Sequence, residues 1–278
     1  MKFSFKPLLV AAAAFVVGSA THAASGHDWT LTSGNISLAF SHDGYSSIRA
    51  AGGNLSTPAT TPVVPGLGNP GSVNTAKLNK VTTHLDLPLT SGSTTGDSLI
   101  SLVAKGSLLQ IKRGFEDDEG FMHLWSVFLT NWEVDLPSST VYAEMHTSKH
   151  QSSAVNLGRV AVFHTSWLGE PNIDSEGQIV LDTTNAQGQS LAHASGNLNG
   201  VLRLDRNTAD LILVGMGLPT APDENVVRLF HDPHKDWGTL SFTANLTGTP
   251  TVPEPSDFAL VGAGMLALWA TQRSSRKA

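Results

Sequence analysis

The stretch that decides the fold is residues 107–132, which read SLLQIKRGFEDDEGFMHLWSVFLTNW. Two apolar-rich segments, 107–115 and 121–130, flank an acidic turn at 116–120. The second segment carries large apolar residues at both odd and even positions, as a strand buried on both faces does. We therefore predict that 121–130 is an interior strand paired with 107–115 through the acidic turn, and that Trp125 belongs to the core.

Outward from this pair, the chain shows many more short strand patterns, separated by turns rich in Gly, Asn and Asp. One such turn, 41–44, is expected to join two strands into a β-hairpin, and the Gly- and Pro-rich segment 52–75 is expected to be a loop. The absence of a long amphipathic helix pattern predicts an all-β fold, a single antiparallel β-sandwich or jelly-roll domain over 24–250. The further strands are expected at 36–40, 45–48, 85–89, 99–104, 140–146, 159–167, 178–182, 201–205, 209–215, 226–231 and 239–246.

The composition of this domain limits its partners. Residues 24–250 hold 12 Lys or Arg against 21 Asp or Glu, a net charge of −9 with histidine neutral. Such a charge argues against nucleic acid and anionic membrane surfaces as partners. The chain has no cysteine, so a disulfide cannot stabilise it and the hydrophobic core has to do so.

The N-terminal residues have the order of a secretory signal peptide. Lys2 and Lys6 precede an apolar segment at 8–17, and small residues surround Ala23. We predict cleavage after Ala23, which makes 1–23 a signal peptide.

The C-terminal residues 251–278 have the opposite order of charge. A breaker at Val252, Pro253, Glu254 and Pro255 precedes an apolar run at 258–270 and a basic tail at 271–278. A helix over the apolar run is ~20 Å long, short of the ~30 Å hydrocarbon core of a bilayer. The basic tail is expected to stay on the cytoplasmic side of the inner membrane.

This segment resembles the PEP-CTERM sorting signal of Gram-negative bacteria, on the motif Val252 to Pro255 and the segments that follow it. The resemblance implies an exosortase-type enzyme as a processing partner, transient residence in the inner membrane, and a mature protein at the cell surface or outside the cell. Proteins of this type are associated with exopolysaccharide and biofilm. The tail departs from the pattern in two ways: its basic residues are split into Arg273 and the pair Arg276 and Lys277, and polar Thr271 and Gln272 separate them from the apolar run.

Catalytic motifs are missing from the chain, which has no G-x-S-x-G elbow, no H-E-x-x-H and no phosphate-binding loop. No catalytic residue is therefore assigned, and a non-enzymatic role is favoured. An exported hydrolase remains an alternative that requires several polar residues to converge in one pocket. The residues concerned are Glu133, Glu144, Asp174, His146 and His164.

Metal binding is a second alternative. His231 and His234 lie in the sequence HDPHKD and form a candidate zinc site, although zinc needs three or four converging ligands. The acidic runs 116–119 and 172–177 are candidates for calcium, against a simpler interpretation as polar turns. If neither metal binds, the chain has no cofactor.

Carbohydrate binding is the third alternative. Trp29, Trp132, Trp167 and Trp237 fall near predicted strand ends, where their rings either stack on sugars or close the ends of the sandwich. The second interpretation is favoured. The leading hypothesis from the sequence is thus an exported structural or adhesive protein, with a carbohydrate- or metal-binding module as the alternative and a hydrolase behind both.

Overall fold

The computed structural model of the chain describes residues 27–62, 67, 71–149, 152–165, 178–185, 188–198, 200–222 and 224–250. Trp29–Gly248 form one compact unit. The second unit, Met1–Asp28 with Thr249–Ala278, falls almost entirely outside the described residues. The predicted signal peptide 1–23 and the predicted sorting signal 251–278 therefore lie outside the described part of the chain.

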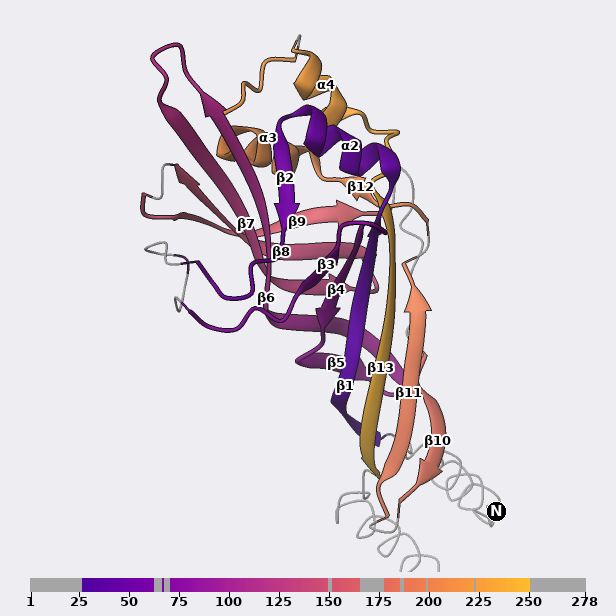
Figure 1. The fold of residues 1–278 in the computed structure, drawn as a ribbon. Coiled ribbons are helices and arrows are strands. Elements are labelled where there is room, and N and C mark those ends of the chain that lie inside the picture. Colours follow the sequence, from indigo (N-terminus) through magenta and orange to yellow (C-terminus); the bar gives the residue numbers. More distant parts are fainter. Residues whose placement is uncertain are drawn as a thin grey trace, which may run out of the picture. The chain divides into compact units, whose positions relative to one another are not determined.

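Six strands form the first sheet, in the order β10-β11-β13-β1-β4-β3 (Figure 1). Their bounds are β1 (His27–Phe40), β3 (Lys77–Asn79), β4 (His84–Pro88), β10 (Val180–Thr184), β11 (Ser190–Asn197) and β13 (Gly238–Pro250). Strict alternation sets the faces of the long strands: Ile36 and Leu38 of β1 are fully buried, whereas the intervening Ser37 is half-buried on the other face. This sheet therefore has one core face and one outer face.

Seven strands form the second sheet, in the order β12-β9-β8-β7-β6-β2, with β5 paired to β6. Their bounds are β2 (Gly53–Ser56), β5 (Ser91–Thr95), β6 (Ser98–Glu116), β7 (Met122–Asp135), β8 (Thr140–Lys149), β9 (Val155–His164) and β12 (Arg203–Leu204). The predicted strands 99–104 and 107–115 are parts of the single long strand β6, which is interrupted by a register shift between Ala104 and Leu108.

The predicted central hairpin is confirmed. β6 and β7 pair antiparallel from Glu116 opposite Met122 to Ser101 opposite Asp135, and β7 lies between β6 and β8. Val127 and Leu129 belong to the main core, and the intervening Phe128 is buried on the opposite face. Residues 127–129 are therefore buried on both faces. Nearer the turn, β7 is no longer covered in this way: β8 ends at Lys149, the partner of Trp125, and Phe121 is 64% exposed.

One hydrophobic core joins the two sheets. It combines Leu38 and Phe242 of the first sheet with Ile111, Val127 and Trp132 of the second. The strands of the two sheets cross in Figure 1, and the fold is all-β and mainly antiparallel, with 58% strand and 13% helix. Since β6, β7, β8 and β9 follow one another as neighbours in one sheet, the connectivity is that of a meander rather than a jelly roll.

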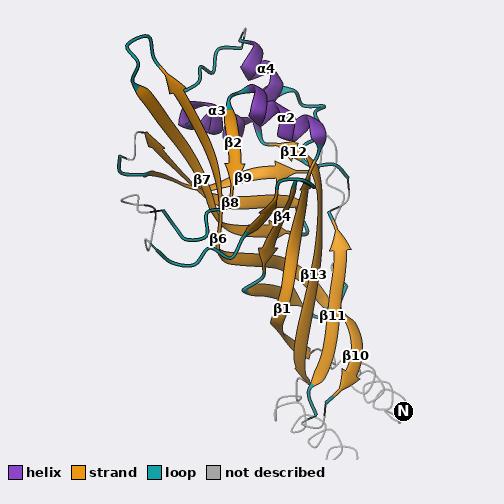
Figure 2. Cartoon of the chain, viewed as in Figure 1, coloured by secondary structure: helices purple, strands orange, loops and turns teal. Residues whose placement is uncertain are grey.

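Three short helices correct the sequence prediction. Segments 45–48, 209–215 and 226–231 were expected to be strands, but they belong to α2 (His42–Ala50), α3 (Arg206–Gly215) and α4 (Asn225–His231). The predicted turn at 41–44 is the start of α2, where the Ser41 side chain accepts a hydrogen bond from the amide of Gly44. All three helices lie together near β2 and β12 (Figure 2).

The burial pattern of α3 explains the error. Thr208, Ala209, Ile212 and Leu213 are buried, which is the spacing of a helix face, and Asp205 caps the helix by accepting a hydrogen bond from the Thr208 amide. In a segment this short, continuous apolar residues fit a strand equally well. Among the residues described, none of the helices has the length and apolar character needed to cross a bilayer.

Candidate binding surface

The predicted zinc ligands His231 and His234 lie in different surroundings. His231 ends α4 and its Nε2 atom lies 2.8 Å from Oδ1 of Asp210 on α3. His234 is exposed in the following turn, where its backbone amide donates to Oδ1 of Asp232 at 2.9 Å. Within the described ranges, no three His, Asp or Glu residues are grouped so that they would hold a metal ion. The zinc site therefore stays a prediction from sequence.

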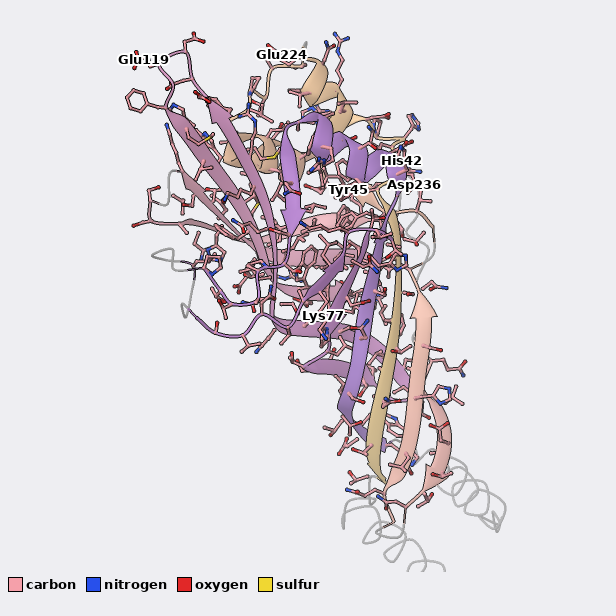
Figure 3. The ribbon with its side chains drawn as sticks, viewed as in Figure 1. His42, Tyr45, Lys77, Glu119, Glu224 and Asp236 are labelled. Atoms are coloured by element: carbon pink, nitrogen blue, oxygen red, sulfur yellow. The ribbon has the colours of Figure 1, made fainter. Side chains whose placement is uncertain are left out.

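The other residues of HDPHKD have structural roles. Nη1 of the buried Arg203 donates to the carbonyls of Pro233 and Lys235, at 3.2 and 3.3 Å. Nζ of Lys235 donates to Oγ of Ser47 on α2 at 2.7 Å, and Oδ1 of Asp236 accepts from the Gly238 amide at 2.7 Å. Figure 3 shows Asp236 on the same side of the helices as His42 of α2. This polar loop thus anchors α2 to the segment after α4.

The acidic residues proposed for a hydrolase each have their own contacts. Oε2 of Glu133 accepts from Nε of Arg159 at 3.0 Å, and Oε2 of Glu144 accepts from Nδ2 of Asn131 at 2.7 Å. His146 is buried on the outer face of the second sheet, opposite Phe128. His164 pairs with Thr140 and Arg203 in the strand ladder, and Asp174 lies outside the described residues. The described members of this set therefore have no common pocket.

The acidic turn is held by its own hydrogen bonds. Oδ2 of Asp117 lies 2.5 Å from Nε2 of His123, and Oδ1 accepts from the amides of Phe121 and Glu119 at 2.8 and 3.1 Å. The hydrogen bond from His123, followed by that from Phe121, lowers the pKa of the Asp117 carboxyl. Because Asp117 is already engaged in closing the turn, calcium binding at 116–119 gains no support. The other calcium candidate, 172–177, lies outside the described residues.

Two of the four tryptophans are core residues rather than exposed rings. Trp132 is fully buried and Trp237 is 2% exposed. Both line an internal cavity of about 20 Å³ whose other walls are also apolar. Nε1 of Trp29 donates to Oδ1 of Asp97 at 2.9 Å, while Trp167 lies outside the described residues. A cavity of this size has room for about one water molecule, so it is no ligand pocket.

Trp125 is half-buried rather than part of the core. Nζ of Lys149 lies 4.8 Å from the ring centroid, and Gly217 packs so closely on the ring that a Cβ atom there would come within 2.6 Å of it. Further along the hairpin the Arg113 guanidinium lies over Phe115, whose ring stacks on that of His123. Neighbouring groups therefore cover these rings, which makes them a support for the hairpin rather than a stacking platform for sugars.

The outer face of the first sheet carries a different kind of surface. Apart from His193, which lies opposite Asn245, its central strands β1, β11 and β13 present mainly uncharged polar side chains, and these alternate with buried residues such as Ala194 and Ala244. We refer to these residues as the polar face: Asn35, Ser37, Ser195, Asn197, Ser241, Thr243 and Asn245.

Part of the polar face is bonded within the protein. The Asn35 and Ser37 side chains donate to Oδ1 of Asp86 on β4, at 3.3 and 3.0 Å, and Nδ2 of Asn245 donates to Oγ of Ser33 at 2.9 Å. Sequence reasoning missed this surface. Its signal was the alternation of hydroxyl and amide residues with apolar ones in 239–246, but β1 and β11 are far from this segment in the chain.

Comparison with known proteins gives no family. No family model and no curated protein matches the chain. Among solved structures, it is similar to the C-terminal domain of HtaA from Corynebacterium glutamicum, with a TM-score of 0.40 and 13% identity over 79% of this chain and 99% of that one. It is also similar to heme binding protein HtaB from the same organism, with a TM-score of 0.31 and 10% identity over 80% and 96%.

Proposed function

We propose that this chain is an exported protein of the cell surface or extracellular matrix of a Gram-negative bacterium, where it associates with exopolysaccharide in a structural or adhesive role. The observation that carries the proposal is the polar face, an array of uncharged hydroxyl and amide groups on a domain that is otherwise acidic. Sugars are recognised through such groups by hydrogen bonds. The signal peptide and the sorting signal predicted from sequence supply the route of export.

Cell fractionation tests this function. The full chain, with an epitope tag placed in the exposed turn at 80–82, is expressed in a host that has the matching exosortase and secretes exopolysaccharide. We expect the tag in the surface and matrix fractions, and we expect a strain that cannot make the polysaccharide to release it into the medium. Equal retention of the tag by both strains would show that the polysaccharide does not hold the protein.

A second candidate function is a metal-binding module. The Asp210 carboxylate lies within hydrogen-bond distance of one ring nitrogen of His231 and leaves the other for a ligand, an arrangement common behind metal-binding histidines. Zinc binding to the native state would raise the unfolding temperature of the parent chain but not of a His231→Ala, His234→Ala variant. Heme, the ligand named for HtaB, is added in a parallel titration. A heme spectrum that changes with the parent and not with the variant would assign heme to this site.

A further inference from the structure

We infer that the polar face binds a neutral polysaccharide, and that the exposed positions of β11 and β13 make the main contacts. This inference rests on the proposed function and names both the surface and the class of sugar polymer. The pairs concerned are Ser195 with Thr243 and Asn197 with Ser241, which lie directly opposite each other in the ladder.

Hydrogen-bonding capacity distinguishes these four residues from their neighbours. The side chains of Asn35 and Ser37 donate hydrogen bonds to Asp86, and that of Asn245 donates one to Ser33. Within the described part of the protein, no side-chain hydrogen bond is made by Ser195, Asn197, Ser241 or Thr243. Ser241 is half-buried and the other three are exposed. Their hydroxyl and amide groups are therefore open to an external partner. When a sugar hydroxyl replaces water at such a group, each new hydrogen bond contributes a modest net free energy to binding.

Rigidity favours binding along this surface. The ladder between β11 and β13 runs without a register shift from Ser190 opposite Gly248 to Asn197 opposite Ser241. Buried Ala194, Ala244 and Phe242 fix the backbone from the core side. Side chains on one face repeat at about 7 Å along a strand and about 4.8 Å between strands, so the groups form a preorganised grid. An extended polymer can contact such a grid at several points, which compensates for weak individual contacts.

Charge selects a neutral polymer. The domain has a net charge of −9, and the polar face is flanked by Asp86 on β4 and Asp182 on β10. Lys77 on β3, labelled in Figure 3, is the cationic residue opposite Asp86, and His193 lies 2.7 Å from Asp182. A polyanion would meet repulsion from the net negative charge of the domain. A second copy of the chain would carry the same charge, and it would bury hydroxyl groups without burying apolar area in return.

Binding of the purified full-length chain to insoluble polysaccharides tests the inference. The neutral probes are cellulose and cross-linked dextran, and the acidic probe is cross-linked alginate. The variant Ser195→Ala with Thr243→Val removes one opposed pair of hydroxyls at exposed positions. The control Ser91→Ala with Thr95→Val removes the same two groups from exposed positions of β5, outside the polar face.

We expect the parent to bind a neutral probe and not alginate, the polar-face variant to bind it about tenfold more weakly, and the control to bind like the parent. Thermal unfolding of all three chains verifies that they are folded. Stronger binding to alginate, binding to neither neutral probe, or equal weakening in both variants would overturn the inference. Retention of the chain on cells is measured separately by the fractionation experiment, and loss of that retention is the result that would overturn the proposed function.

Discussion

At the level of single residues, His146 shows what burial of a titratable group does in this fold. It lies opposite Phe128 on β7, is 5% exposed, and its Nδ1 atom has no hydrogen-bond partner among the described residues. Loss of solvation lowers the pKa of the imidazole, and the nearby Glu144 carboxylate only partly opposes this effect. The folded state therefore disfavours the protonated ring.

This burial predicts a dependence of stability on pH. Below the ordinary pKa of 6.5 the unfolded chain binds more protons at His146 than the folded chain does, so the free energy of unfolding falls as the pH drops below that value. Above it, the contribution of His146 is constant. Urea unfolding at about pH 7.5 and pH 5.5 measures the difference. His146→Leu should reduce the loss, whereas His84→Asn, at an exposed position, should not. An unchanged pH dependence in His146→Leu would show that other groups cause the loss.

Gly217 gives a second prediction at this level. Its φ of 69° is unfavourable for other residues, and a Cβ atom would lie 2.6 Å from the Trp125 ring. Gly96 has a φ of 56°, but a Cβ atom added there would have no described residue within 4 Å. Gly96→Ala should therefore lower the free energy of unfolding by about 1 kcal/mol through backbone strain alone, and Gly217→Ala by about 3 kcal/mol because it adds a steric clash. Equal losses, measured by urea unfolding, would mean that α3 does not pack tightly against the hairpin.

At the level of elements, the three helices depend on their caps and on packing. They are 9, 10 and 7 residues long, too short to be stable alone. Ser41 and Asp205 accept hydrogen bonds from the first-turn amides of α2 and α3, but Glu224 makes no such bond at the start of α4. Two of the three N-cap side chains therefore make a capping hydrogen bond, and the third serves as the comparison without one.

Removing each cap in turn tests this difference. Ser41→Ala and Asp205→Ala should each lower the free energy of unfolding by about 1 kcal/mol, because an amide in the first turn of the helix loses its partner. Glu224→Ala should change it by less than about 0.5 kcal/mol. Chemical denaturation measures all three variants. A loss in Glu224→Ala as large as in the other two would imply that capping hydrogen bonds are not what stabilises these helices.

At the level of the whole molecule, the C-terminal segment 251–278 predicts that the chain is processed before it reaches the cell surface. The apolar run 258–270 lies between Pro255 and the basic tail, and it is too short to span the hydrocarbon core of a bilayer stably. Mass spectrometry of surface material should therefore find a chain that ends near Pro255 when the exosortase is present. In a strain without the enzyme, the chain should stay in the inner membrane with 258–270 intact.

Neutral replacements of Arg273, Arg276 and Lys277 test the role of the tail in the same strains. These charges favour a cytoplasmic position, so their loss should let unprocessed protein leave the membrane. An intact Ala278 in surface material from the parent would contradict processing and leave a tail-anchored protein in its place.

The sequence by itself determined the class of the fold and its central pairing. Two apolar-rich segments, 107–115 and 121–130, with an acidic turn between them and with apolar residues at both odd and even positions of the second, form a pattern that spans a few residues and so is visible in the chain. Burial on both faces at 127–129 followed from the same pattern. These features were predictable because neighbouring residues alone specify them.

Only the tertiary structure decided where the helices form and which polar residues meet. Short apolar segments such as 209–215 fit a strand or a helix equally well, and α3 is a helix because Asp205 caps it and Ile212 and Leu213 reach the core. His231 meets Asp210 rather than His234, and the polar face joins β1 to β11 and β13 from distant parts of the chain. Such contacts depend on strand order and register, which long-range packing sets and local pattern does not.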